Sequence, residues 1–394
     1  MTKHLRILLA LILLMAVSVA KASTLYYVVD NIRYAVNTDD NTAMVVAYSA
    51  YKDMTEITIP ATITEDGVTY RVTYIDSKCF EDCSSLASVN LPDGINFKGG
   101  AFYHCTGLKS IIIPASVKSL PSDCFEGCTN LTSITIPNSV TSLGVSCFAG
   151  CTNLTNITIP NTVTELDQYC FAGCTGLTNI IIPSSVTSLP YRCFWGCTSL
   201  TSIVIPNTVS YIDELCFQNC SSLSSINLPD GIKKLSGVFN NCTGLQSITI
   251  PSTVIELADS YVNDDYRYGD YVGCFEGCTS LKSIDITNPN TKLGYRCFSG
   301  CTSLKNITIP DYITELPSRC FEGCTSLTSI TIPNSVTKLG IDCFEGCTSL
   351  TNITIPNSIT ELPFYCFKGC TNLTSIIIPN SVTTIREYCF YRCI

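Results

Sequence analysis

The sequence predicts an α/β repeat fold, in which a solenoid of short parallel strands and short helical turns follows a small β-rich N-terminal cap. The main observation is a motif, Cys-Phe-x-x-Cys or a variant without the first Cys, that recurs fourteen times. Ten of the thirteen steps between second cysteines are 23 residues long, two are 22, and the step from Cys242 to Cys278 is 36. A repeat of this length cannot bury its apolar face alone, so successive units are expected to stack around one continuous core.

One unit, residues 124–146, shows how each repeat is expected to fold. Its stretch L-x-x-I-x-I alternates apolar and polar residues, which predicts a strand with one buried face, and Pro137 ends that strand because proline cannot donate to a strand ladder. A second short extended segment is expected at 140–143. The cysteines and phenylalanine of 147–151 fall at i, i+1 and i+4, a spacing that predicts an inward-facing helical turn.

The pattern C-F-x-G-C-T-x-L-T-x-I-x-I-P-x-S-V-T-x-L resembles the BspA-like class of leucine-rich repeats, which occurs in exported microbial surface proteins. The match covers about four-fifths of the chain and is highly specific for the fold. The resemblance implies a leucine-rich-repeat solenoid that adheres to host matrix proteins, epithelial surfaces or other microbes. The first Cys of the unit is commonly Ala in that family, so this sequence departs from the pattern at twelve of its fourteen units.

The sequence predicts a leader segment followed by two regions. Basic residues precede an apolar run of 14 residues, Ile7 to Ala20, which is shorter than the roughly 20 needed to span a bilayer as a helix. Ala20-Lys21-Ala22 has the small-x-small form of a signal peptidase site, so residues 1–22 are expected to be a signal peptide and the protein to be secreted or at the cell surface. Short β-rich stretches separated by Asn and Asp turns predict the cap over 23–75, and the solenoid is expected to occupy 76–394.

Composition narrows the classes of function. The net charge of -9 argues against nucleic-acid binding, which needs clustered Lys and Arg. His4 and His104 are the only histidines, and no nucleophile–base pair, acid cluster or phosphate-binding loop stands outside the repeat. We therefore expect no catalytic residue, no metal site and no cofactor, and we expect that the protein is not an enzyme.

The 26 cysteines allow three interpretations: buried thiol ladders, disulfides, or metal ligands. Ala101 and Val238 replace the first Cys of two units while Cys105 and Cys242 remain, whereas an obligatory bond within each pair should lose both partners together. Residues at i and i+4 of a helix also have Cβ atoms about 5–6 Å apart, too far for a disulfide. The pair C-x3-C without histidine is a poor zinc site. The sequence favours buried thiols, and disulfides between neighbouring coils are the alternative.

The outward positions of the repeat strand form one candidate binding face, which the resemblance places on the concave side of the stack. They carry hydroxyls and amides with little charge, a composition that suits a hydrogen-bonding platform and equally suits ordinary solvated strands. The candidate residues are Thr132, Thr135, Thr155, Thr158, Thr331 and Thr354.

The 36-residue step contains a second candidate, a 13-residue insertion whose segment 258–271 is rich in Tyr and Asp. Insertions in solenoids form surface loops, and this composition resembles that of recognition loops, although an inert insertion is the alternative. The candidate residues are Tyr261, Asp264, Asp265, Tyr266, Arg267, Tyr268, Asp270 and Tyr271.

These observations predict an exported, non-enzymatic surface protein that mediates adhesion or protein–protein interaction with host or microbial surfaces. The expected partners are host matrix or cell-surface proteins or glycans, with no nucleic acid and no membrane span. The alternative is a glycan-binding module of a surface nutrient-capture system, for which the hydroxyl-rich face is the discriminating feature.

Overall fold

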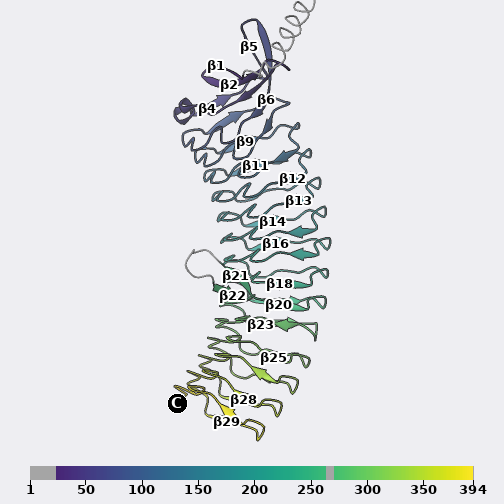
Figure 1. Ribbon diagram of the computed structural model, residues 1–394, viewed down its shortest axis with the longest axis vertical. Helices are drawn as coiled ribbons and strands as arrows, with labels where there is room; N and C mark the ends of the chain where they lie inside the picture. The colour runs from purple at the N-terminus through teal and green to yellow at the C-terminus, as the bar shows by residue number, and fades with distance from the viewer. Residues whose placement is uncertain (1–23, 263–269, 394) are drawn as a thin grey trace, which may run out of the picture.

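The protein is an elongated stack of coils that follows an N-terminal sheet (Figure 1). The computed structural model describes residues 24–262 and 270–393. Each coil is one repeat unit and has three sides, which we call strand row A, strand row B and the turn row. The turn row holds the Cys-Phe-x-x-Cys segments, and the two strand rows hold short strands that run parallel to their neighbours.

Strand row A is the L-x-x-I-x-I side of the repeat. Its strands are β4 Glu56–Thr58, β7 Ser88–Asn90, β9 Ser110–Ile112, β11 Ser133–Thr135, β14 Asn179–Ile181, β16 Ser202–Val204, β19 Ser247–Ile250, β23 Ser283–Ile286, β27 Asn352–Thr354 and β29 Ser375–Ile377. The central residue of a typical row A strand is buried between two exposed ones, and equivalent residues of adjacent coils pair, as Ile111 does with Ile134. The expected parallel strands are confirmed.

Strand row B lies on the next side of each coil and has shorter strands. They are β10 Ser119–Leu120, β12 Ser142–Leu143, β13 Glu165–Leu166, β15 Ser188–Leu189, β17 Tyr211–Ile212, β18 Lys234–Ser236, β20 Glu256–Ala258, β24 Lys292–Leu293, β25 Glu315–Leu316, β26 Lys338–Leu339, β28 Glu361–Leu362 and β30 Thr384–Ile385. In most of these strands a polar residue faces outward and a leucine or isoleucine is buried.

A six-stranded sheet covers the N-terminal end of the stack, and its last strand belongs to the first coils. Its strands are β1 Leu25–Val29, β2 Ile32–Asn37, β3 Thr42–Val45, β5 Thr62–Glu65, β6 Val68–Ile75 and β8 Asn96–Phe97, in the order β1-β2-β3-β6-β5 with β8 beside β6. The 3-10 helix η1, Ser49–Asp53, carries the buried Tyr51, whose ring lies 5.0 Å from that of Phe80. The sheet therefore covers the apolar end of the stack that would otherwise face water.

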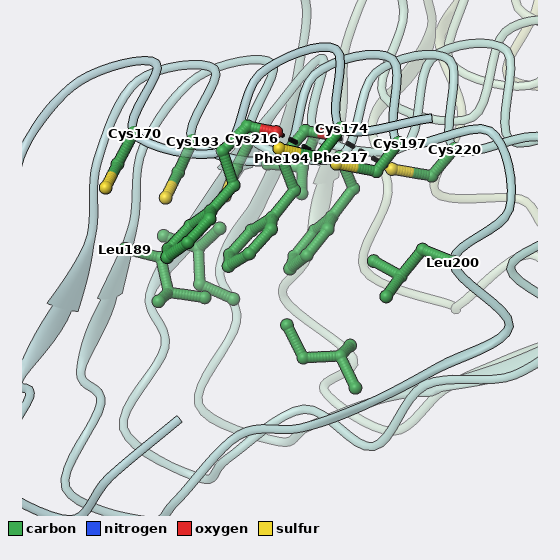
Figure 2. Packing of buried hydrophobic residues seen from close by; sticks show 14 of the residues in the cluster. Cys170, Cys174, Leu189, Cys193, Phe194, Cys197, Leu200, Cys216, Phe217 and Cys220 are labelled. Carbon is green, nitrogen blue, oxygen red and sulfur yellow. Dashed lines mark hydrogen bonds between the residues drawn. The ribbon is translucent and has the colours of Figure 1, made fainter. Parts of the chain in front are cut away.

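The core is built from files of identical side chains that run along the stack. Fourteen phenylalanine rings, from Phe80 to Phe390, stack with centroids 5.3–5.9 Å apart and interplanar angles of 1–15°. Figure 2 shows two parallel cysteine files beside two of these rings, one through Cys193 and the other through Cys197. All 26 cysteines are free thiols, and every one except Cys393 is buried.

The expected helical turns at the Cys-Phe-x-x-Cys segments are wrong. Residues 145–150 form consecutive turns, and η1 is the only helical element in the described ranges 24–262 and 270–393. Ser146 and Gly150 have φ of +52° and +69°, which a right-handed helix does not allow. The N–H of Phe148 donates to the carbonyl of Cys170 in the next coil at 2.8 Å, so the turn row is a third ladder between coils.

Candidate functional site

The 36-residue step forms a β-hairpin that leaves the stack between β20 and β23 (Figure 1). Its strands, β21 Ser260–Val262 and β22 Asp270–Val272, pair antiparallel with Tyr261 opposite Tyr271. The two tyrosine rings lie 5.1 Å apart, and the residues are 49% and 51% exposed. The hairpin therefore presents a paired aromatic surface to solvent.

A partly buried hydrogen bond holds the base of this hairpin. Ser260 is 2% exposed, and its Oγ donates to Oε2 of Glu214 at 2.6 Å. Glu214 lies 46 residues earlier, in the loop that follows β17 Tyr211–Ile212, so the hairpin is fixed to a part of the stack outside its own coil. A hydrogen bond to a charged acceptor is stronger than one between neutral groups, and this one fixes where the hairpin starts.

The structure places only part of the expected loop site. Tyr261 and Tyr271 are brought together, and Asp270 belongs to β22. The remaining candidates, Asp264, Asp265, Tyr266, Arg267 and Tyr268, lie outside the described residues. The sequence indicated an insertion, but its hairpin strands were missed, although Tyr and Val in Ser260–Val262 and Asp270–Val272 favour strands.

The six threonines expected on the binding face are all exposed on row A or next to it. Thr135 forms a bridge with Thr158, and Thr331 forms one with Thr354, so the structure gathers two pairs rather than one site. The hydroxyl of Thr132 donates to the carbonyl of Lys109 at 3.4 Å. Oγ1 of Thr155 accepts a hydrogen bond from Asn156 at 3.4 Å. The hydroxyls of Thr132 and Thr155 therefore already form hydrogen bonds within the stack.

Apolar residues occupy the same outward column of row A and were missed by sequence reasoning. Ile112, Ile181, Val204 and Ile377 are 84%, 66%, 58% and 69% exposed. Ile181 pairs directly with Val204, which gives row A an apolar step within its hydroxyl-rich face. Ile112, Ile181 and Val204 each directly follow the buried central residue of their strand, and this alternation was available as a sequence signal.

The cysteines offer little reactivity toward a ligand. Burial raises the pKa of Cys128, Cys174 and Cys324 to about 12, so these side chains stay protonated at neutral pH. Among residues 24–262 and 270–393 there is no group of three or more His, Cys, Asp or Glu side chains placed to hold a metal ion.

The turn row carries the same acidic pair twice, in different surroundings. Asp342 accepts a hydrogen bond from Arg319 at 3.2 Å, and Glu345 forms an ion pair with Lys368 at 2.6 Å. The equivalent pair Asp123 and Glu126 has Gly100 and Ala149 at the positions of those two cations. Burial and the hydrogen bond with Asp123 raise the pKa of Glu126 to about 7.

Comparison with known proteins gives matches over nearly the whole chain. The model of the BspA type Leucine rich repeat region matches residues 46–177, 141–265 and 271–394. No curated protein matches the sequence. Within the described parts of the chain, no helix has the length and apolar character needed to cross a membrane.

Three solved structures illustrate the similarity. A leucine-rich repeat protein from Bacteroides ovatus is 32% identical, with a TM-score of 0.84, covering 93% of this chain and 92% of that one. A leucine rich cell surface protein from Faecalibacterium prausnitzii is 27% identical, with a TM-score of 0.54 and coverage of 91% and 95%. The pneumococcal vaccine antigen PcpA is 19% identical, with a TM-score of 0.55 and coverage of 93% and 94%, and shows similarity of fold alone.

Proposed function

The chain belongs to the BspA-type leucine-rich repeat family, and from this membership we propose that it is a non-enzymatic, exported surface protein that adheres to host matrix or cell-surface proteins. The N-terminal 22 residues serve as its signal peptide. A relative described as a leucine rich cell surface protein supports the proposed location.

The observation that carries this proposal is the exposed pair Tyr261 and Tyr271 on a hairpin with a fixed base. Tyrosine is enriched at protein interfaces because a large, rigid ring gives contact area at a small cost in conformational entropy. The hydrogen bond from Ser260 to Glu214 holds the hairpin before a partner arrives, which lowers the entropy lost on binding. The two rings would act as the anchor of the interface, and row A would add broad, shallow contacts.

A binding screen tests this function. The full chain is assayed against immobilised matrix proteins and against polysaccharides, beside a variant with residues 261–271 replaced by a short Gly/Ser link. Saturable binding to a protein that disappears in the variant is the expected result. Protein binding that survives the replacement would move the interface away from the hairpin. Absence of binding to every immobilised protein would contradict the adhesin function.

A further inference from the structure

Two neighbouring coils depart from the repeat pattern. The residues that differ line one groove on row B. The groove has a volume of about 620 Å³ and includes Asp259, which directly precedes the hairpin, and Tyr295 and Tyr312 from the following coils. Its size falls within the roughly 300–1,000 Å³ of small-ligand sites. Tyr312 occurs where most other coils have a serine or threonine, and Asp259 belongs to the insertion and has no counterpart in them.

The groove lies at one of the points where pairing along row B is interrupted, as it also is between β13 and β15, β17 and β18, and β26 and β28. β24 pairs with β20, and β25 pairs with β26, but no pairing joins β24 to β25 in the described chain. Thr291 is fully buried, and its Oγ lies 2.8 Å from the carbonyl oxygen of Val254, so it fills a place that a buried valine such as Val140 holds in other coils. Asn290 is left exposed at the rim of the groove. The changed coil therefore contributes Asn290 and Thr291 to the groove at this interruption.

Two aromatic side chains line the groove. Tyr312 is 67% exposed and stands where an ordinary coil has a serine such as Ser335. Tyr295 is half-buried and occupies a variable position, which is Val145 or Ser318 in some coils and the aromatic Tyr191 or Phe364 in others. Neither substitution is needed for the core, because both positions lie outside its buried files. The rings therefore supply flat apolar surface inside an otherwise polar groove.

Two of the three carboxylates of the groove have a lysine nearby, and the third, Asp259, is balanced in net charge by Lys292. Glu256 lies 3.6 Å from Lys234 and pairs in register with Lys292 on β24. Glu315 lies 3.9 Å from Lys338. The groove consequently has little net field with which to select an ion, since opposite charges at these distances cancel beyond a few ångströms. Its carboxylate oxygens still accept hydrogen bonds, and Lys292 still donates them.

Asp259 is the polar group best placed to orient a ligand. Its Oδ1 accepts a hydrogen bond from the backbone N–H of Tyr295 at 3.3 Å, which fixes the carboxylate beside the aromatic ring. Oδ2 of Asp259 has no hydrogen-bond partner among the described residues, so it is available to a hydroxyl donor. A carboxylate with one oxygen held by the backbone is a suitable positioning group for a sugar hydroxyl.

We propose that this groove binds a neutral, hydroxyl-rich oligosaccharide. The rings of Tyr295 and Tyr312 contact the C–H faces of the sugar rings, and Asp259, Asn290 and Lys292 exchange hydrogen bonds with its hydroxyls. Charge compensation disfavours an anionic or cationic ligand over a neutral one. The proposal goes beyond protein adhesion by the hairpin and requires a different set of residues.

Affinity electrophoresis of the full chain tests the proposal. Native gels contain either a neutral polysaccharide (a glucan, mannan, xylan or galactan) or a charged one (heparin or polygalacturonate). Retardation by at least one neutral polysaccharide is expected. Tyr312→Ala should weaken the binding about tenfold or more, because it removes a stacking surface, and Asp259→Asn should weaken it several-fold. Tyr211→Ala is the matched control, since Tyr211 is 52% exposed on the same row in an ordinary coil.

Several outcomes would overturn the proposal. They are failure of every neutral polysaccharide to retard the chain, preference for a charged polysaccharide, and equal loss of binding in the Tyr211→Ala and Tyr312→Ala variants. Thermal melting of each variant shows whether it is folded. Replacing residues 261–271 should leave retardation by the polysaccharide unchanged, so failure of the groove and failure of the proposed adhesion site are separable.

Discussion

The Sγ of Cys151 donates a hydrogen bond to the carbonyl oxygen of Phe125 in the preceding coil, at a distance of 3.2 Å. The second cysteine makes this contact in thirteen of the fourteen units, at 2.9–3.2 Å. The first cysteines make no such bond within residues 24–262 and 270–393, and they fill apolar space. This difference explains why Ala101 and Val238 replace first cysteines while Cys105 and Cys242 are kept.

We predict that the two cysteines of one unit differ in their contribution to stability. Cys147→Ala and Cys151→Ala remove the same atoms from buried sites, but only the second also removes a hydrogen bond. Cys151→Ala should lower the free energy of unfolding by about 1 kcal/mol more than Cys147→Ala does. Urea unfolding of both variants measures the difference. Equal losses would show that the thiol bond contributes nothing.

The reactivity of the cysteines should show that the core consists of buried, free thiols. Burial holds the pKa of Cys128 at about 12, so the buried thiols should not react with a thiol reagent at pH 8 in the native protein. Cys393, which is only partly buried, and Cys83, whose pKa is lowered by its hydrogen bond with Cys105, are the expected exceptions. In denaturant without reductant all 26 thiols should react. If the number of thiols that react in denaturant falls more than a few below 26, disulfides are present and the core of free thiols is contradicted.

Stability should depend on pH through Glu126. Its pKa is 4.5 as the ordinary value and about 7 in the folded chain, so the native state binds more protons than the unfolded state between these values. The free energy of unfolding should therefore decrease as pH rises from about 4.5 to 7, by about 1 kcal/mol after allowance for partial exposure.

Ala149→Lys is the matched test of this pH effect, because Lys368 occupies the equivalent position beside Glu345. The new lysine should stabilise the ionised carboxylate of Glu126 and raise the melting temperature at pH 8. At pH 4, where the carboxyl is protonated in both states, the variant and the parent should melt together. A shift of equal size at both pH values would rule out ionisation of Glu126 as its cause.

The hairpin should depend on its hydrogen bond to the stack. Ser260→Ala removes the donor to Glu214 and should increase the rate of proteolysis within 259–272 several-fold, with little change in the melting temperature of the coils. Glu214→Gln keeps an acceptor and should retain most of the protection. Equal protection in Ser260→Ala and the parent would show that the hairpin is held by other contacts.

The strands that repeat in every coil could be predicted from the sequence, whereas the conformation of the turn row could not. Ile134 and Leu143 lie on the expected buried faces, because each strand alternates around a fixed apolar column. The spacing of Cys147 and Cys151 indicated a helical turn, but the recurring Gly150 adopts φ of +69° and the intervening N–H groups bond to the next coil. That glycine was the available signal against a helix.

The candidate sites could be predicted from the sequence only in part, because they depend on contacts between distant residues. The insertion was visible as a 36-residue step, and the binding role of its tyrosines stays a prediction. The contact from Ser260 to Glu214 spans 46 residues and leaves no periodic trace. The row B groove is lined by residues of two neighbouring coils and of the insertion. Its presence follows from packing between coils, which the pattern of a single coil does not show.

The most direct test of the central claim is the affinity of the full chain for a matrix protein before and after loss of the hairpin aromatics. The double variant Tyr261→Ser with Tyr271→Ser is compared with Tyr211→Ser, which removes an equally exposed ring elsewhere. Surface plasmon resonance should show the dissociation constant rising about tenfold or more in the double variant and changing less than about twofold in the control. Equal affinity in all three proteins would contradict binding through the hairpin.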